Sequence, residues 1–422
     1  MLLYKLPISR YKSLSFLLIA TIVLLIFIGL GCRESESNHN SSDDSGPPQE
    51  DDSGIDDANH DEFTEPDQWG PYGVGVRRFD FYDTSRDDRH LPTLIYYPAK
   101  ATPITEDRYL QAVQEANLIE RLRQIAYCAV EDAEPDYHNA PYPIVMFSHG
   151  SGARKEEYKF FFEYLSSHGY ICVVLDHTGN EGIINYWPRY MDMSLKRPLD
   201  ISFVLDKVLE MIDTSGDPFE SLGDPEKIGL AGHSYGGNTT LALVGATFSY
   251  DYIDELCKDD PGDPYICPIP GARDFLEAHL PDKRIKAAIT LAHDGADSYF
   301  GPDCIGVSSI KIPIMIDSGT SDVMCPYETE ALPCFEQLQS PAYLLKMIGG
   351  GHIGYTDFVN FGPMRLNRMH SLIQRYAVAF FGYYLKENEN YSYYLGDVAA
   401  ARWNEELDDF SFTSKTSAKN IH

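Results

Sequence analysis

Short apolar runs alternate with segments of helical period through most of this 422-residue chain. Apolar runs bounded by turn residues are typical of buried strands, and apolar residues three or four apart are typical of helices that cover a sheet. The runs predict strands at 143–147, 170–175, 227–231, 285–291, 312–316 and 343–348. Helical spacing occurs at 155–167, 197–212, 238–244 and 366–385. This alternation predicts an α/β fold with a mainly parallel sheet and helices on both faces.

Two further features complete the expected domain, which spans 69–398. Alternating residues at 74–81 and 93–97 predict an antiparallel pair of strands before the parallel core. Polar, partly helical segments at 104–139 and 248–283 predict two insertions near the active-site face, the first over one edge of the sheet. A helix is expected to open at Arg197, with Pro198 in its first turn and Asp200 as a cap.

The first 32 residues have the pattern of an export signal. Three basic residues precede an uncharged apolar run from Leu14 to Leu30, and Gly31-Cys32 closes it. The order resembles a bacterial lipoprotein signal, in which Cys32 would be lipidated, although Gly29 stands where that signal usually has leucine. An uncleaved signal anchor is the alternative. Both predict export, and the lipoprotein reading places the body in the bacterial cell envelope, on the periplasmic side or the cell surface.

Charge and composition separate the ends of the chain from its middle. Residues 33–68 carry thirteen acidic residues and one basic residue, and they are rich in Ser, Asp and Asn, which predicts a disordered acidic tether. Residues 399–422 are expected to form a polar C-terminal tail. The net charge of the whole chain is −30, which disfavours nucleic acid as a partner.

Eight cysteines in an exported chain point to disulfide bonds. Cys257 with Cys267 and Cys325 with Cys334 are close in sequence and are predicted to be local disulfides. Cys172 lies in an apolar strand and is predicted to be a buried thiol. Cys128 and Cys304 remain, either as a third bridge across the first insertion or as two unrelated thiols. No metal-ligand spacing of the C-x-x-C or H-E-x-x-H type occurs, so no metal site is predicted.

The stretch Gly232-His233-Ser234-Tyr235-Gly236-Gly237 carries the chemistry. A buried strand precedes it and a helix follows, which is the setting of a G-x-S-x-G nucleophile elbow. In such an elbow a sharp turn exposes the serine hydroxyl at the carboxyl edge of the sheet, beside a helix N-terminus that favours negative charge. We therefore predict Ser234 as the nucleophile.

A serine nucleophile needs a base and an orienting acid, which follow in the order Ser, Asp or Glu, His. His352 directly follows the last parallel strand on a glycine-rich loop and is predicted to be the base, ahead of His149, His177 and His293. Asp322 follows the preceding strand and is predicted to be the acid. Asp294 is its alternative, because it follows the strand at 285–291.

The tetrahedral intermediate also needs two backbone donors for its oxyanion. The amide of Tyr235 directly follows the nucleophile, and the amide of Ser151 lies in the loop after the strand at 143–147. These two amides are the predicted oxyanion hole.

Together these motifs resemble the platelet-activating-factor acetylhydrolase-like serine esterases of the α/β-hydrolase fold, whose bacterial members are often labelled dienelactone-hydrolase-like. The matching pieces include Phe147-Ser148-His149-Gly150, Asp176-His177, Arg197-Pro198-Leu199-Asp200, the elbow, Gly319-Thr320-Ser321-Asp322 and Gly351-His352. True dienelactone hydrolases use a cysteine nucleophile, so Ser234 argues against that activity.

The resemblance implies a carboxylic ester hydrolase that acts through an acyl-enzyme and needs no cofactor. Its substrate would be a small-molecule or lipid ester, with short acyl esters or phospholipid acyl chains as the expected class. A cutinase-like or polyester-hydrolase-like esterase is one alternative. A catalytically silent surface binding protein on a hydrolase scaffold is the other.

Overall fold

The computed structural model describes residues 63–182, 190–259, 267, 271–339, 341–404 and 408–415. The described residues belong to one compact unit, which begins at Phe63. The predicted export signal, Cys32 and most of the predicted tether therefore lie outside the described residues. Within the described ranges, no helix is long and apolar enough to cross a membrane.

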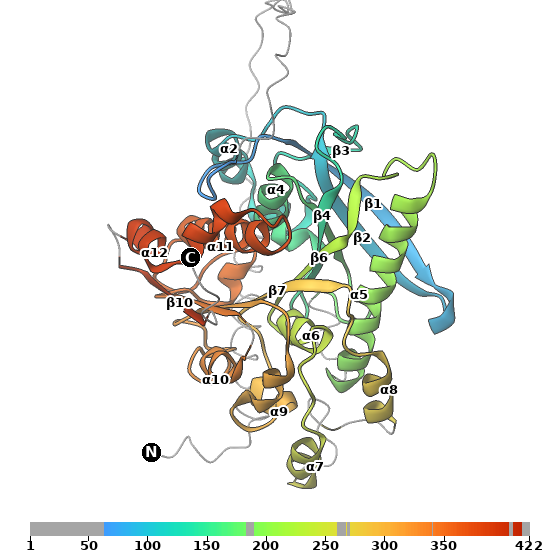
Figure 1. Cartoon of the computed structure of the whole chain (residues 1–422), viewed down its shortest axis with the longest axis vertical. Helices are drawn as coiled ribbons and strands as arrows, with labels where there is room; N and C mark the ends of the chain where they lie inside the picture. The colour runs from blue at the N-terminus through green and yellow to red at the C-terminus, as the bar shows by residue number, and fades with distance from the viewer. Residues whose placement is uncertain are drawn as a thin grey trace, which may run out of the picture. The chain divides into compact units, whose positions relative to one another are not determined.

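One mixed sheet organises the part of the chain that the structure describes (Figure 1). Its ten strands lie in the order β10-β9-β8-β7-β6-β4-β5-β2-β1-β3. The strands β5, β4, β6, β7, β8 and β9, which are neighbours in this order, pair in parallel. The pairs β1 with β2, β2 with β5, and β9 with β10 are antiparallel. The bounds are β1 (Gly73–Asp83), β2 (Arg89–Ala99), β3 (Val130–Glu131), β4 (Tyr142–Ser148), β5 (Ile171–Leu175), β6 (Gly223–His233), β7 (Ile285–Leu291), β8 (Ile314–Gly319), β9 (Ala342–Met347) and β10 (Phe410–Lys415).

Successive side chains of the central strands enter two cores, one on each face of the sheet. In β4, Ile144 and Met146 belong to one core, while Val145 and Phe147 belong to the other. The first core is covered by α5 (Tyr190–Asp213), α6 (Tyr235–Leu243), α9 (Ala296–Phe300) and α10 (Ala331–Gln337). The second is covered by α4 (Lys159–Ser167), α11 (Leu366–Tyr384) and α12 (Asp397–Asn404). The predicted α/β fold, with helices on both faces, is confirmed.

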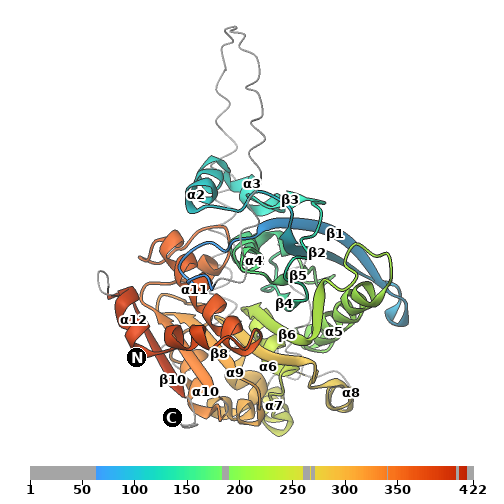
Figure 2. The same cartoon turned by 45° about the horizontal axis from the view of Figure 1, so that its top comes forward.

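The two predicted insertions are present. The first contains α2 (Glu106–Glu115), α3 (Leu118–Arg123) and β3, which pairs with β1 at the edge of the sheet (Figure 2). The buried carboxylate of Glu163 in α4 accepts hydrogen bonds from the amides of Tyr127, Cys128 and Ala129, which attaches the insertion to the core. The second insertion contains α7 (Tyr250–Asp259) and α8 (Ala272–His279).

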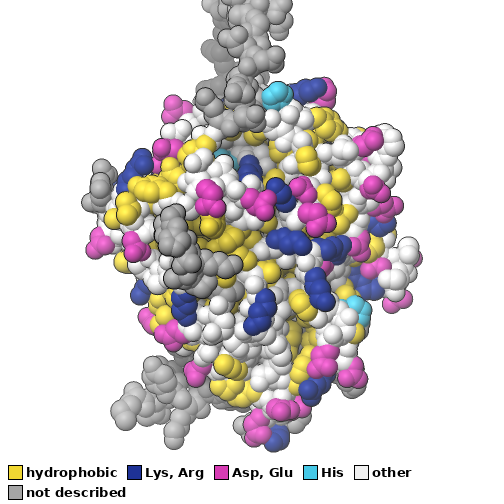
Figure 3. Space-filling model, viewed as in Figure 1, with side chains coloured by type: hydrophobic (Ala, Val, Ile, Leu, Met, Phe, Trp, Pro, Cys, Tyr) yellow, Lys and Arg dark blue, Asp and Glu magenta, His cyan; other side chains and the backbone are white. Residues whose placement is uncertain are grey.

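Short 3-10 helices connect these elements in the described ranges. They are η2 (Thr84–Arg86), η3 (Lys155–Tyr158), η5 (Pro302–Ser309), η6 (His352–Tyr355) and η7 (Glu389–Leu395). On the face drawn in Figure 3, acidic and basic side chains are interspersed rather than separated into large patches of one sign. The excess of acids is therefore distributed as solvated surface charge there.

Both predicted boundaries of the domain are wrong. The predicted polar tail contains β10, which pairs with β9 along its whole length, and Phe410 and Phe412 are buried against Tyr376. Polar residues alternate with those phenylalanines because only one face of an edge strand is covered. At the other end, Phe63 packs against Tyr391 and Tyr394, so the domain begins before residue 69.

The helix expected to open at Arg197 begins at Tyr190 instead, and Pro198 lies inside α5. Proline inside a helix removes a hydrogen bond and is normally costly. Asp200 does not cap this helix. Its fully buried carboxylate is held by Arg89 and Arg86, with distances of 2.7 and 2.8 Å from the guanidinium nitrogens. Long-range ion pairs therefore determine the position of this segment.

One of the two predicted disulfides is confirmed, and the other is wrong. Cys257 is bonded to Cys267, but Cys334 is bonded to Cys304. Cys334 lies in α10 and faces the core beside η5, where its Cα atom is 4.9 Å from that of Cys304. The alternative bridge between Cys128 and Cys304 is therefore also wrong, and Cys128 and Cys325 are buried thiols.

Mass mapping checks this pairing. After denaturation and alkylation without reductant, we expect a Cys304–Cys334 cross-linked peptide, with Cys325 and Cys128 alkylated. The bond closes a loop of 30 residues, so its removal by Cys304→Ala with Cys334→Ala should lower the free energy of unfolding by roughly 3.5 kcal/mol in the chain-entropy model. A Cys325–Cys334 peptide would contradict the assignment.

Candidate active site

The turn between β6 and α6 holds Ser234 in a strained backbone conformation. Its φ and ψ angles are 56° and −122°, a region that residues other than glycine rarely occupy. Such a conformation costs on the order of 1–3 kcal/mol and persists only where the surroundings enforce it. Here the Ser234 amide donates to Leu291 O at 2.9 Å, and the Gly237 amide donates to Ser234 O at 2.8 Å.

Glycines around the turn allow backbones to approach closely. A Cβ atom on Gly236 would lie 1.9 Å from Ser148 O, and one on Gly232 would lie 2.2 Å from Gly236 O. A Cβ atom on Gly237 would lie 2.5 Å from the His293 side chain. None of these positions accepts a side chain without movement of the neighbouring strand or loop, so the predicted elbow requires its glycines.

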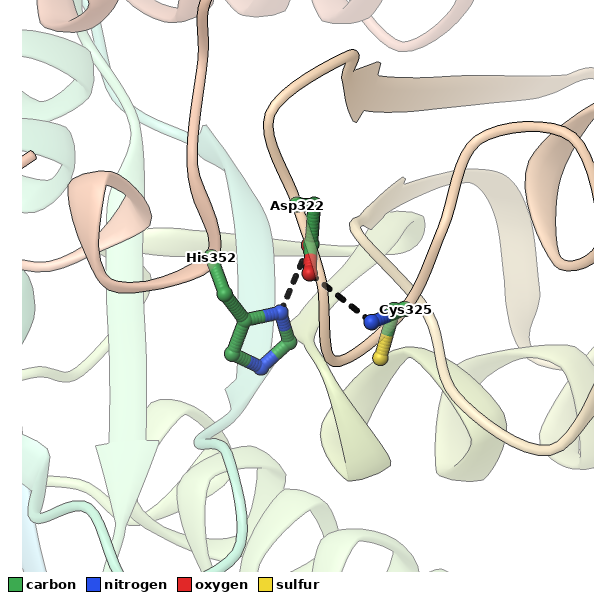
Figure 4. Close-up of side chains that lie close together, drawn as sticks. All are labelled: Asp322, Cys325 and His352. Carbon is green, nitrogen blue, oxygen red and sulfur yellow. Dashed lines mark hydrogen bonds and ion pairs between the residues drawn. The ribbon is translucent and has the colours of Figure 1, made fainter. Parts of the chain in front are cut away.

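Ser234, His352 and Asp322 form one chain of hydrogen bonds. His352 Nε2 lies 2.9 Å from Ser234 Oγ. On the other side of the ring, His352 Nδ1 lies 2.7 Å from Asp322 Oδ2, the contact drawn in Figure 4. The other carboxylate oxygen of Asp322 accepts the amides of Met324 and Cys325, each at 2.8 Å. Because the carboxylate accepts hydrogen bonds, it favours the tautomer with a proton on Nδ1, which leaves Nε2 to accept a proton from Ser234.

The loop that carries His352 is held from three directions. Asn360 Oδ1 accepts the Gly351 amide at 2.8 Å. Tyr355, at the end of η6, donates to Asp317 at 3.0 Å, and burial raises the pKa of this carboxyl well above its ordinary value. Asp357 accepts the amide of Lys159 at 2.7 Å, which joins the same loop to the start of α4. The position of the imidazole therefore depends on β8 and α4 as well as on β9.

The residues weighed against His352 and Asp322 have other partners. His293 bonds to Thr290 and to Glu330 O, and burial lowers its pKa to about 4. Asp294 lies beside the elbow, with its amide on Ser234 O, but the carboxylate that contacts His352 belongs to Asp322. The structure thus brings together the three residues first chosen from the sequence.

The predicted oxyanion loop lies beside the elbow. A Cβ atom on Gly150 would lie 3.1 Å from His233 Nδ1 and 3.3 Å from Ser234 Cβ, so the loop contacts the elbow one residue before Ser151. The Gly150 amide donates to the Tyr158 hydroxyl at 2.9 Å, and that hydroxyl lies 3.1 Å from His233 Nδ1. Because Tyr158 accepts from Gly150, its own hydrogen can be donated to His233. Tyr158 therefore connects the loop to the elbow.

Tyr235 is the first residue of α6, and the first amides of an α-helix point out of its N-terminal end. Its backbone donor therefore belongs to the end of the helix that favours negative charge. The structure places the two predicted donor positions, Tyr235 and Ser151, on the two segments that meet at Ser234.

A second Ser-His-Asp arrangement lies at the start of the predicted oxyanion loop and supports it. Ser148 Oγ lies 2.9 Å from His177 Nε2, and His177 Nδ1 lies 3.0 Å from Asp200. All three side chains are fully buried, so they do not meet a substrate. The His177 amide donates to His149 Nε2, and Arg197 donates to His149 O. This array fixes the backbone immediately before Gly150.

Of the three side chains in this array, only Asp200 is charged. Burial alone would raise the pKa of Asp200, but hydrogen bonds from Arg89 and His177 more than offset it and hold the pKa below its ordinary value. Burial, assisted by the charge of Arg197, lowers the pKa of His177 to about 3. His177 is therefore neutral at physiological pH.

Sequence reasoning missed the roles of Tyr158, His177, Arg197 and Asp200. The last three lie in motifs that carry the family resemblance, but their spacing along the chain gave no reason to join them. Tyr158 lies in the segment 155–167, whose spacing predicted only a helix. Charged residues that stand among apolar ones were an available signal, because a charge that is buried needs a partner.

Comparisons with known proteins find similarity to esterases and related hydrolases. A family model described as Chlorophyllase matches residues 133–253, which include the oxyanion loop and the elbow but not Asp322 or His352. "Chlorophyllase type 0" of Chenopodium album is 29% identical over 114 residues, which are 24% of this chain and 28% of that protein. "Platelet-activating factor acetylhydrolase" of Cavia porcellus is 25% identical over 226 residues, 42% of this chain and 51% of that protein.

The chain has the α/β-hydrolase fold. Its sheet order, its strand–Ser234–helix turn and the order of Ser234, Asp322 and His352 along the chain are those of the fold. It resembles the platelet-activating-factor acetylhydrolases, as its motifs predicted, and the chain spans about a quarter and about half the length of the two curated relatives. A solved ferulic acid esterase from Streptomyces cinnamoneus superposes with a TM-score of 0.49 and 20% identity, covering 75% of this chain and 91% of that one.

The strain at Ser234 predicts different stabilities for two variants of this α/β-hydrolase. Ser234→Ala keeps the strained angles and should leave the thermal unfolding midpoint nearly unchanged. Ser234→Gly accepts these angles without strain, so it should be more stable than Ser234→Ala by about 1 kcal/mol, after the entropy of glycine in the unfolded chain is subtracted. Equal midpoints for the two variants in thermal unfolding would contradict the claim that the turn is strained.

Proposed function

We propose that this α/β-hydrolase is a serine carboxylic ester hydrolase that works through an acyl-enzyme, with Ser234 as nucleophile, His352 as base and Asp322 as the orienting acid. One observation carries the proposal: the hydrogen-bonded chain from Asp322 through His352 to Ser234, at a strained turn. A serine hydroxyl is a weak nucleophile without such a base, and a base held in one tautomer is the arrangement that activates it.

The reaction follows from the positions of these atoms. Ser234 Oγ attacks the ester carbonyl carbon while its proton passes to His352 Nε2. The amides of Tyr235 and Ser151 donate to the oxyanion, and the carboxylate of Asp322 stabilises the imidazolium. His352 then returns the proton to the leaving alcohol. Water then attacks the acyl-enzyme through the same proton transfers, and the carboxylic acid is released. Nearby His233 is neutral, because burial and then the charge of His352 lower its pKa well below its ordinary value.

Short acyl esters, or the acyl chains of phospholipids, are the substrate class that we propose. The similarity to an acetylhydrolase supports a short acyl group. Two exposed apolar side chains, Val323 next to Asp322 in the chain and Phe361 nine residues after His352, suit a lipid ester better than a charged polymer. A cutinase-like or polyester-hydrolase-like activity uses the same elbow and remains the alternative substrate class.

A catalytically silent binding protein is the alternative from another class. It would require neither the tautomer-fixing hydrogen bond nor the strain at Ser234, and the strain costs free energy that a protein that only binds has no reason to carry. The intact geometry therefore favours hydrolysis.

Hydrolysis of p-nitrophenyl acetate tests the proposal. Ser234→Ala and His352→Ala should each remove activity by several orders of magnitude and to similar extents, because triad members act as a unit. Asp322→Asn should lower kcat by roughly 10⁴-fold, because an amide does not hold the required tautomer. Asp294→Asn is the matched control and should be mild.

A crippling Asp294→Asn with a mild Asp322→Asn would show that the acid is wrong, and activity that survives Ser234→Ala would refute the mechanism. An acyl series from acetyl to palmitoyl, with an insoluble polyester in parallel, separates the two substrate classes. A rate that falls steeply beyond short chains supports the first class, and release of soluble products from the polyester supports the second.

We also propose that the chain is exported and tethered to the membrane through Cys32. The support is the order of basic, apolar and Gly-Cys residues in the first 32 positions. Cys32→Ser should abolish incorporation of a palmitate analogue in a bacterial host and should retain the uncleaved precursor. A native chain that takes up no label would leave the signal anchor as the explanation.

A further inference from the structure

The thiol of Cys325 lies beside the pair formed by Asp322 and His352 (Figure 4). The turn that follows β8 folds back so that the Cys325 amide binds Asp322 Oδ1, which brings the whole residue next to the carboxylate. One ligand atom from each of Asp322, Cys325 and His352 lies within 4.8 Å of the other two, and all three residues are buried. The hydrolytic mechanism has no use for this thiol.

These three atoms are a suitable ligand set for a thiophilic divalent cation. Zn²⁺ binds cysteine thiolate, histidine nitrogen and carboxylate oxygen at about 2.0–2.3 Å, and three protein ligands leave a fourth position for water. Ligand atoms around a tetrahedral ion with these bond lengths are about 3.5 Å apart. To hold an ion at these bond lengths, Asp322 Oδ2 and His352 Nδ1, which are 2.7 Å apart, must separate slightly, while the ligand atom of Cys325, which lies within 4.8 Å of the others, needs only a small adjustment.

We propose that Asp322, Cys325 and His352 form an inhibitory Zn²⁺ site, and that occupation of this site stops ester hydrolysis. The inhibition, but not the binding, rests on the proposed function. When the ion takes Nδ1, the proton of the neutral imidazole moves to Nε2, where it faces Ser234. His352 is then a donor at Nε2 and does not accept the serine proton.

The proton balance is simple. Cys325 releases one proton to solvent when its thiolate binds, while the imidazole keeps one proton and changes tautomer. Asp322 exchanges its contact with Nδ1 for the metal. No electron is transferred, so removal of the ion by a chelator should restore the enzyme.

Two other buried thiols provide matched controls. Cys172 lies inside β5, and burial raises its pKa to about 12. Cys128 lies in the first insertion against Glu163, and burial raises its pKa to about 11. Each is a buried cysteine outside the cluster.

The first experiment measures p-nitrophenyl acetate hydrolysis by the full chain against Zn²⁺ concentration, without thiol reagents. Each rate is divided by that of the same variant without metal, so that changes in basal activity cancel. We expect reversible inhibition of the native chain, at least tenfold weaker inhibition of Cys325→Ser, and native inhibition of Cys128→Ser and Cys172→Ser. Equal inhibition of Cys325→Ser and the native chain would overturn the proposal.

The second experiment measures binding without activity. In a Ser234→Ala background, Co²⁺ should produce a thiolate-to-cobalt absorption band that disappears with Cys325→Ser and persists with Cys172→Ser. The absence of this band would refute the site, even if the chain hydrolyses esters. If the chain hydrolyses no ester, the band still decides whether the site binds metal.

Folding of the cysteine variants is checked by circular dichroism. If Cys325→Ser does not fold, Cys325→Ala replaces it. His352→Gln in the Ser234→Ala background provides a variant that leaves the thiol intact. It should weaken Co²⁺ binding at least tenfold, and unchanged binding would count against the proposal.

Discussion

The strained turn at Ser234 is the constraint on which the rest of the site depends. A positive φ at a serine is unfavourable, so the surrounding structure must supply the free energy that holds it. Two hydrogen-bonded contacts of the Ser234 backbone supply part of this free energy. The Ser234 amide is fixed to the end of β7, and its carbonyl begins the hydrogen bonding of α6. The glycines then allow β4 and its loop to approach, which places the predicted oxyanion loop beside Ser234. A relaxed turn would change the position of Ser234 Oγ relative to β7, α6 and the loop after β4 at the same time.

Parallel pairing explains why residues so far apart in the chain meet at this turn. The strands β4, β6, β8 and β9 all end at one edge of the sheet, and each contributes the loop that follows it. Position in the strand order therefore predicted Ser234, Asp322 and His352 from the sequence, because each residue directly follows an identifiable apolar strand. The same reasoning predicted both insertions, since each interrupts the regular alternation of strands and helices.

The failures of sequence reasoning have a common physical cause. Cys334 bonds to Cys304 rather than to its neighbour Cys325, because the orientation of α10 in the core, and not separation along the chain, decides which thiols meet. The start of α5 and the role of Asp200 were wrong because arginines from the β1–β2 hairpin bind that carboxylate. The strand β10 was missed because an edge strand covered on one face carries few apolar residues. Each outcome depends on a partner more than 29 positions away, which local pattern does not contain.

Two Ser-His-Asp arrays with nearly equal hydrogen-bond lengths exist in this molecule, and their surroundings separate them. Ser148, His177 and Asp200 are fully buried, and two arginines bind the carboxylate directly. Ser234 is also largely buried, but it stands in a strained turn at a helix N-terminus, where negative charge is favoured. The three residue types alone are therefore insufficient to identify a catalytic site. The strained backbone makes the difference, because a protein has no structural need for an unfavourable serine conformation when an ordinary one, as at the end of β4, supports the same hydrogen bonds.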